Sequence, residues 1–365
     1  MVSSVKYFPN KLTMTWIRSS YKEGTLTPAE LADEIVRRAE KYRDYNIWIV
    51  APDLKRMMDY IEKLPKDMES LPLWGIPFAV KDNIDVAGCP TTAACPDYAY
   101  DPNEDATVVK KLIGAGAFPV GKTNLDQFAT GLVGTRSLYG EVKNALDPEL
   151  ISGGSSSGSA VSVALGMAAF SLGTDTAGSG RVPAALNGLV GYKPSLGAWS
   201  TKGVVPACAS LDCVTVFANS LEDAEEVNFA ARGVDEECCW SREYKEPLPK
   251  LPKKICLAKD GVTFYGPYAD IYKAKWEQAK KRIEDMGITV EYIDYTMFSK
   301  AASILYDGPW VAERWKDLGD FVESHPGKVF PVTETVLRSG NKPEHTARKV
   351  FEAMHQLQEY RMRAR

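Results

Sequence analysis

Two serines set in glycine-rich turns mark the stretch GGSSSGSAVSVALGMAAFSLGTDTAGSGR, residues 153–181. Ser155 lies in the first turn and Ser179 in the second, where Gly178 and Gly180 flank it. Glycines let the backbone turn sharply and point successive N–H groups at one spot, as an oxyanion hole requires. A flexible linker is excluded because the neighbouring segments AVSVALGMAAFSLG and VPAALNGLVGY have the composition of a core. The pattern favours nucleophilic chemistry.

A nucleophilic serine needs a base, and the histidines are badly placed to supply one. His325, His345 and His355 all lie in the polar C-terminal fifth, so a Ser-His-Asp triad is disfavoured. A lysine can serve instead if burial lowers its pKa enough to leave it neutral near pH 7. Lys81 ends the apolar stretch GIPFAVK. Taken alone, that position favours a solvated lysine at the end of a strand, and the serine turns shift the interpretation toward a base.

Two other chemistries are disfavoured. Residues 116–123, GAFPVGKT, match the G-x-x-x-x-G-K-T pattern of phosphate-binding loops, but a helix precedes them and Phe118 to Val120 have the character of a strand. Cys208 and Cys213 have no histidine or second cysteine pair at ligand spacing. We expect neither a metal nor a cofactor.

Composition restricts the partners. The chain has 365 residues, 45% of them apolar, and a formal net charge of −4, so it lacks the basic footprint of a nucleic-acid or membrane-surface binder. A small-molecule partner is favoured. The N-terminus does not resemble a secretory signal, and the apolar run at residues 160–173 is too short to cross a bilayer. Seven scattered cysteines fit free thiols and a cytoplasmic protein.

Helices and strands alternate along the chain. Residues 27–42 predict an amphipathic helix capped by Thr27 and Glu30, residues 76–80 a strand, residues 105–117 a helix that glycines end, and residues 118–124 a returning strand. We expect a buried helix over residues 159–171, and later a strand at residues 254–258, a helix capped by Asp270 and a strand at residues 288–294. This order predicts an α/β fold with helices on both faces of a sheet.

The motifs GIPFAVKDNIDVAGCPTTAACP, GKTNLDQFATG, GGSSSGSA and GTDTAGSGRVPAALNGLVGYKPS together resemble the amidase signature family over residues 25–230. The resemblance implies the amidase signature fold, a central mixed β-sheet covered by α-helices on both faces. It also implies a Ser-Ser-Lys triad, with Ser179 as nucleophile, Ser155 as the bridging serine after a cis peptide bond and Lys81 as base. The implied oxyanion hole consists of the N–H groups of Thr176, Ala177, Gly178 and Ser179. Ser157 replaces a glycine usual in the family turn.

In the implied reaction, neutral Lys81 takes a proton from Ser155, which takes one from Ser179 as that side chain attacks an amide carbonyl. Ammonia leaves, and water repeats the path on the acyl-enzyme. Asp175 and Arg181 flank the nucleophile. A loop-supporting ion pair and a direct catalytic part remain equally open for them.

Within the family, GTDTAGSGRVPA, LVGTRS and ILYDGPWVAERW resemble allophanate hydrolases. That resemblance implies that Tyr306 and Arg314 hold the substrate carboxylate, which suits the planar bidentate guanidinium. It further implies a role in urea degradation after a biotin-dependent urea carboxylase, with release of ammonia and carbon dioxide. Two alternatives stay open, namely an amidase of other specificity, such as a glutamine-dependent amidotransferase subunit, and a non-catalytic amidase-like fragment.

We expect one amidase domain over residues 1–365. It would comprise a helical N-terminal arm at residues 1–70, a catalytic α/β core at residues 71–300 and a helical substrate-pocket segment at residues 301–365. Because the chain ends at QLQEYRMRAR, within a helical pattern, the core is expected to be incomplete at the C-terminus. The sequence does not determine the oligomeric state, and a homodimer stays open.

Overall fold

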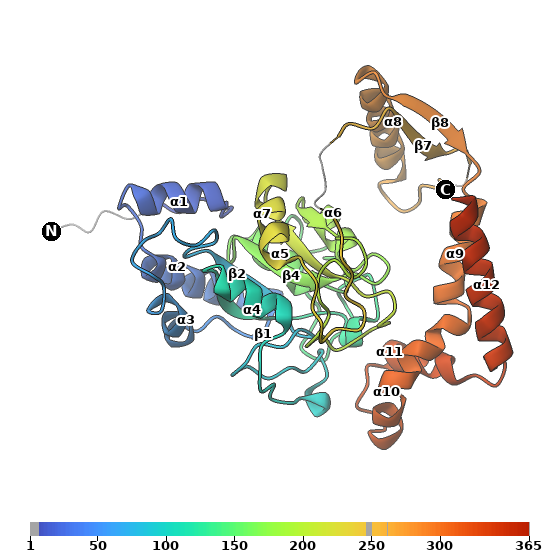
Figure 1. The fold of residues 1–365 in the computed structure, drawn as a ribbon, viewed down its shortest axis with the longest axis horizontal. Helices are drawn as coiled ribbons and strands as arrows, with labels where there is room; N and C mark the ends of the chain where they lie inside the picture. Colours follow the sequence, from blue (N-terminus) through green and yellow to red (C-terminus); the bar gives the residue numbers. More distant parts are fainter. Residues whose placement is uncertain (1–6, 246–249, 261, 365) are drawn as a thin grey trace. The chain divides into compact units, whose positions relative to one another are not determined.

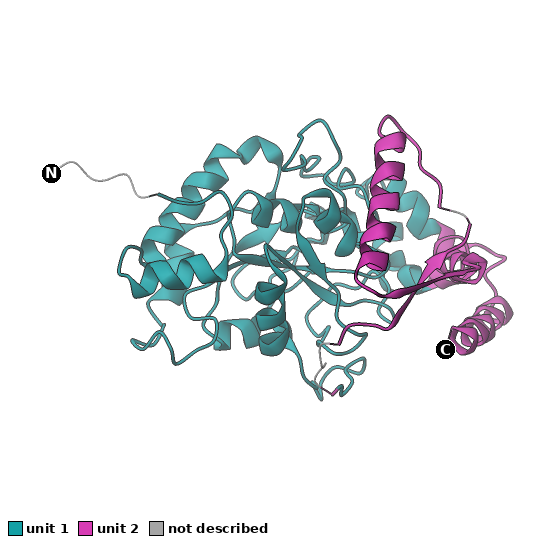
Figure 2. Ribbon diagram, turned by 90° about the horizontal axis from the view of Figure 1, so that it is seen from above, with its two compact units in different colours: residues 1–244, 313–338 teal, residues 245–312, 339–365 magenta. Residues whose placement is uncertain are grey.

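The computed structural model describes residues 7–245, 250–260 and 262–364. The chain divides into two compact units (Figure 2). The first unit comprises residues 1–244 and 313–338, and the second comprises residues 245–312 and 339–365. Residues 313–338 return to the first unit after residues 245–312.

A six-stranded mixed sheet forms the centre of the first unit (Figure 1). Strands β3, β2 and β4 run parallel, whereas β1 pairs antiparallel with β3, and β6 pairs antiparallel with both β4 and β5. Their order is β1 (Trp48–Val50), β3 (Phe118–Thr123), β2 (Pro77–Lys81), β4 (Phe170–Thr174), β6 (Val214–Ala218) and β5 (Val190–Tyr192). Because β2 and β4 are parallel neighbours, their last residues, Lys81 and Thr174, lie at the same edge of the sheet.

Helices cover both faces of this sheet (Figure 1), which confirms the expected fold class. The helices of this unit are α1 (Met14–Lys22), α2 (Pro28–Lys41), α3 (Leu54–Ile61), α4 (Thr107–Gly114), α5 (Ser157–Ala164), α6 (Arg181–Leu186), α7 (Leu221–Ala231), α10 (Ala312–Ser324), which begins at the boundary, and α11 (Pro331–Arg338). Helix α2 begins with the expected capping box, in which Thr27 and Glu30 accept each other's backbone N–H groups. In the segment that matches the phosphate-loop pattern, residues 116–123, the last six residues form the buried strand β3.

Helix α5 is shorter than expected. The sequence predicts a helix over residues 159–171, but α5 ends at Ala164 and the chain re-enters the sheet at Phe170. Gly166 causes the break, because it adopts φ +68° and a Cβ there would come 2.1 Å from Arg38 Nη1. Within α5, Gly158 lets the helix lie against the backbone of Ile47, where a Cβ would come 2.4 Å from the carbonyl oxygen.

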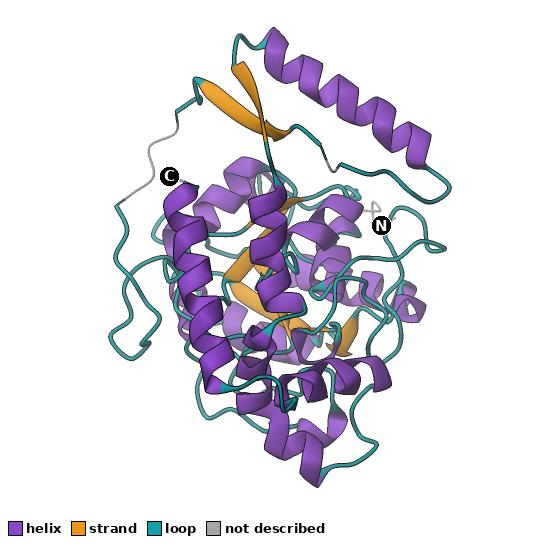
Figure 3. Cartoon of the chain, turned by 90° about the vertical axis from the view of Figure 1, so that its right-hand side faces the viewer, coloured by secondary structure: helices purple, strands orange, loops and turns teal. Residues whose placement is uncertain are grey.

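The second unit has a small sheet of its own (Figure 3). Its two parallel strands are β7 (Lys254–Ala258) and β8 (Thr289–Ile293), and its helices are α8 (Ala269–Asp285), α9 (Thr296–Tyr306) and α12 (Ala347–Arg363). Helix α8 begins one residue before Asp270, so the expected capping role of Asp270 is wrong. Ile304, Ala353 and Tyr360 form the small core between α9 and α12.

All seven cysteines are free thiols, as the sequence predicts. In the part of the chain that the structure describes, no helix is both long enough and apolar enough to cross a membrane.

Candidate active site

The Lys81 side chain is completely buried at the end of β2. Its Nζ lies 2.8 Å from Ser155 Oγ and 2.6 Å from Thr174 Oγ1, at the end of the neighbouring strand β4. Burial lowers the pKa of Lys81 to about 7, and the nearby carboxylates, of which Asp126 contributes most, oppose part of the shift. Lys81 can therefore exchange a proton with the Ser155 hydroxyl near neutral pH.

Ser155 is also fully buried, and the peptide bond from Gly154 to Ser155 is cis, as the family resemblance implies. The Ser155 carbonyl accepts the Asp126 N–H at 3.0 Å. The next hydroxyl, that of Ser156, exchanges hydrogen bonds with the backbone of Thr174 at 3.1 and 3.2 Å. The first serine turn is thus tied to the end of β4.

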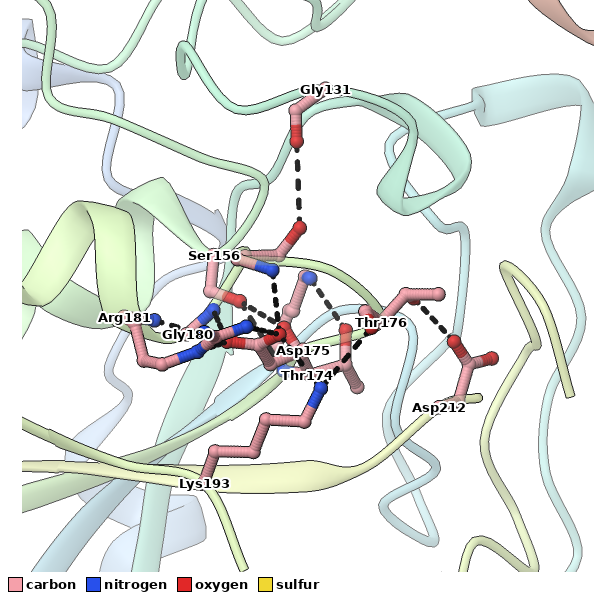
Figure 4. Close-up of polar contacts among 12 residues, drawn as sticks. Gly131, Ser156, Thr174, Asp175, Thr176, Gly180, Arg181, Lys193 and Asp212 are labelled. Carbon is pink, nitrogen blue, oxygen red and sulfur yellow. Dashed lines mark hydrogen bonds and ion pairs between the residues drawn. The ribbon is translucent and has the colours of Figure 1, made fainter. Parts of the chain in front are cut away.

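Ser179 lies between β4 and α6, in a turn that is largely buried. Its carbonyl accepts the Ser156 N–H at 3.3 Å, so the two serine turns meet directly. Its hydroxyl, however, donates to the Gly131 carbonyl at 3.4 Å (Figure 4), and no hydrogen bond joins it to Ser155 Oγ among the described residues. The three expected triad residues thus lie in one region. Lys81 contacts Ser155 directly, whereas the Ser179 hydroxyl contacts Gly131 instead.

Asp175 is the centre of a dense polar network that includes Arg181 and Lys193 (Figure 4). Its buried carboxylate accepts from Arg181 Nε at 2.9 Å, from Lys193 Nζ at 3.1 Å and from the Gly178 N–H at 2.7 Å. The N–H groups of Gly180 and Arg181 donate to it as well, at 3.1 and 3.2 Å. Burial acts to raise the pKa of Asp175, but these donors outweigh burial and hold the pKa far below its usual value. The contacts favour loop support over direct chemistry for Asp175 and Arg181.

This network engages the amide of Gly178, one member of the expected oxyanion hole. The Gly178 N–H already donates to Asp175 at 2.7 Å, and a single N–H cannot serve two acceptors at full strength. Among the described residues, the amides of Thr176 and Ser179 donate to no acceptor. The Thr176 and Ser179 amides therefore remain as candidate donors for an oxyanion.

Three side chains that the sequence analysis does not single out form hydrogen bonds to Thr176 or to Lys81. Asp212 accepts the Thr176 hydroxyl, and Lys193 donates to the Thr176 carbonyl at 3.1 Å. Thr174 offers its hydroxyl oxygen to Lys81. The motifs contain Lys193 and Thr174, but only the folded chain shows what they contact.

Arg314 and Tyr306, the expected carboxylate ligands, lie in different units. Arg314 is buried in α10 and donates to Thr130 Oγ1 at 2.8 Å, so a solvated surface arginine is excluded. Thr130 precedes Gly131, the residue whose carbonyl accepts the Ser179 hydroxyl. Tyr306 ends α9 in the second unit and is half-exposed. Arg314 thus reaches the segment that borders Ser179.

The described residues contain no group of three or more His, Cys, Asp or Glu side chains close enough to hold a metal ion. The buried groups around Ser179 include the Ser155 hydroxyl and a lysine of lowered pKa, the groups that a serine nucleophile would need.

The family model described as Amidase matches residues 30–365, and the chain belongs to the amidase family. The urea amidolyase of Saccharomyces cerevisiae is 47% identical over 304 residues, which cover 81% of this chain and 16% of the yeast protein. A glutamyl-tRNA(Gln) amidotransferase protein from Symbiobacterium thermophilum is 36% identical over 294 residues, which cover 78% of this chain and 60% of the bacterial protein.

A solved structure extends the similarity to the fold. The allophanate hydrolase of Kluyveromyces lactis superimposes with a TM-score of 0.86 at 38% identity, over 97% of this chain and 58% of that protein. The family and the fold expected from the sequence are confirmed. The chain spans less than two thirds of the length of each of these relatives.

Proposed function

We propose that this chain hydrolyses a carboxamide through an acyl-enzyme on Ser179, with Ser155 and Lys81 as the proton relay. The observation that carries the proposal is the buried contact of 2.8 Å between Lys81 Nζ and Ser155 Oγ, at a lysine whose pKa is lowered to about 7. A half-neutral lysine at physiological pH is the base that a serine nucleophile needs where the described contacts offer no histidine.

The steps follow from the contacts. Neutral Lys81 accepts the Ser155 proton while its own N–H donates to Thr174 Oγ1, which keeps the lone pair directed at Ser155. Ser155 in turn accepts the proton of Ser179 after that hydroxyl rotates away from the Gly131 carbonyl. Ser179 Oγ then attacks the amide carbon, and the proton returns through Ser155 to the leaving ammonia.

The oxyanion formed in this attack would be held by the N–H groups of Thr176 and Ser179. Removing one such donor typically lowers kcat by about 10²-fold to 10³-fold. Water then follows the same relay to cleave the acyl-enzyme.

Allophanate is the proposed substrate. Its terminal carboxamide suits the serine, and its carboxylate suits the buried guanidinium of Arg314. The likeness to a yeast urea amidolyase and to a solved allophanate hydrolase supports this choice. The product would decompose to ammonia and carbon dioxide, and a biotin-dependent urea carboxylase would supply the allophanate. Free thiols support a cytoplasmic location.

The test measures ammonia released from allophanate, malonamate and glutamine by the wild type, by Ser179→Ala and by a matched control, Ser171→Ala. Ser171 Oγ is buried on β4 and has no hydrogen-bond partner among the described residues, so its removal should leave turnover unchanged. We expect allophanate to be preferred and Ser179→Ala to be inactive. Preference for glutamine would refute the substrate, and activity in Ser179→Ala would refute the nucleophile. A folded wild type that cleaves none of the three amides would refute the proposed function.

A further inference from the structure

A short loop, residues 207–212, contacts both Thr176, in the turn before Ser179, and Glu313, at the start of α10. Asp212 ends the loop with a side chain that is only 4% exposed. Its Oδ2 accepts the N–H groups of Ala207 and Cys208 at 2.8 and 3.0 Å, which closes the loop on itself. Its Oδ1 accepts the Thr176 hydroxyl. One carboxylate therefore holds both the loop and the first residue of the candidate oxyanion hole.

Thr176 is held from two directions. Asp212 takes its side-chain hydroxyl, and Lys193 donates to its carbonyl at 3.1 Å (Figure 4). The held carbonyl fixes the peptide plane between Thr176 and Ala177, and the held hydroxyl fixes the Thr176 side chain. The Thr176 N–H carries no acceptor among the described residues. A preorganised donor is what an oxyanion hole requires, because reorientation during the reaction would cost transition-state stabilisation.

The other side of the loop is held by Glu313 in the first turn of α10. Glu313 accepts the Ser210 N–H at 2.8 Å, the Ser210 hydroxyl at 2.6 Å and the Cys208 thiol at 3.0 Å. The next residue along α10 is Arg314, which donates to Thr130. Glu313, which holds the loop, and Arg314, the candidate ligand of the substrate carboxylate, are thus adjacent residues of α10.

We propose that Asp212 is a positioning residue that sets the Thr176 N–H in the oxyanion hole, and that Glu313 fixes the loop carrying Asp212 to the helix that carries Arg314. The inference rests on the proposed function and adds residues to it. Asp212 and Glu313 touch no reacting atom and act through Thr176.

The experiment is a double-mutant cycle on kcat and KM for malonamate, with Asp212→Asn, Thr176→Val and the double variant. Each single variant should lower kcat about 10-fold to 100-fold with KM changed less than about 3-fold, because a misplaced donor affects the transition state alone. If Asp212 acts through Thr176, adding Asp212→Asn to Thr176→Val should change kcat by less than about 2-fold.

Three further variants separate positioning from general destabilisation. Thr176→Ser keeps the hydroxyl and should keep kcat within about 3-fold of the wild type. Glu313→Gln alone should lower kcat. Added to Thr176→Val, it should leave kcat of that variant unchanged. Asp235→Asn is the matched control, since Asp235 accepts two hydroxyls, those of Thr107 and Ser200, outside the site and should leave kcat unchanged.

Additive losses of kcat in the cycle, or equal losses in Thr176→Ser and Thr176→Val, would overturn the inference and leave the proposed function standing. If Asp212→Asn does not fold, the comparison of kcat between Thr176→Ser and Thr176→Val decides instead, because only Thr176→Ser keeps the hydroxyl that Asp212 holds. A wild type without amide turnover would overturn the proposed function and this role together.

Discussion

Replacing Lys81 with methionine should change how stability depends on pH. Lys81 is completely buried, and its pKa falls from 10.5 to about 7. A shift of this size corresponds to about 5 kcal/mol of unfavourable free energy for keeping the ammonium charged in the folded protein. Methionine is similar in length and carries no charge, so Lys81→Met removes this cost along with the hydrogen bonds to Ser155 and Thr174.

The sign follows from proton binding. The unfolded chain keeps the lysine protonated up to about pH 10.5, whereas the folded chain releases that proton near pH 7. Between these values the unfolded state binds more protons, so the free energy of unfolding rises with pH in the wild type. From pH 7 to pH 9 this contribution amounts to about 2 kcal/mol, and Lys81→Met lacks it.

The assay is chemical unfolding of both proteins at pH 7 and pH 9. The quantity compared is the difference in the free energy of unfolding between the wild type and Lys81→Met at each pH. The other titrating groups are common to both proteins and cancel in this difference, and the lost hydrogen bonds contribute equally at both pH values. We expect the free energy of unfolding of the wild type to rise by about 2 kcal/mol more than that of the variant between pH 7 and pH 9. Ser155→Ala is the control, because it removes the same contact but keeps the lysine and should follow the wild type. An unchanged difference between pH 7 and pH 9 would mean that Lys81 stays charged when folded.

Three other predictions concern activity and the loop. The kcat/KM for malonamate should rise through pH 7 and level off above it, because only neutral Lys81 accepts a proton; a flat profile across this range would contradict the relay. Arg314→Ala should raise KM for allophanate far more than for an uncharged amide of similar size, and equal effects on both substrates would exclude the carboxylate contact. Asp175→Asn should lower the free energy of unfolding by about 3 kcal/mol, since Arg181 and Lys193 lose a buried charged partner; thermal unfolding at the wild-type midpoint would contradict that role.

Local patterns predicted several elements of the first unit well. The capping box at Thr27, the strand that ends at Lys81 and the strand at residues 118–123 each follow from short-range rules of capping and apolar patterning. The helix expected over residues 159–171 was too long, because the small apolar residues after Ala164 suit a buried strand as well as a buried helix. In the fold, Gly166 adopts φ +68° next to Arg38, just after α5 ends.

The candidate site was predictable where motifs carry it and not where long-range contacts do. Ser155, Ser179 and Lys81 stand in recognisable turns and strand ends. The contacts of Asp212 with Thr176 and of Glu313 with Cys208 join residues 36 and 105 positions apart, and neither carboxylate has a local signal. The same limit applies to the Gly178 N–H, which motif matching assigns to the oxyanion hole and the fold directs to Asp175.

The central claim is that Ser179 forms an acyl-enzyme with an amide substrate by way of Ser155 and Lys81. Mass spectrometry of the chain, acid-quenched during turnover of malonamate and then digested, tests it most directly. The account predicts a malonyl group on the peptide that carries Ser179, its loss in Ser179→Ala and its slower formation in Lys81→Met. Ammonia release without acylation of that peptide, or a malonyl group on another residue, would contradict the account.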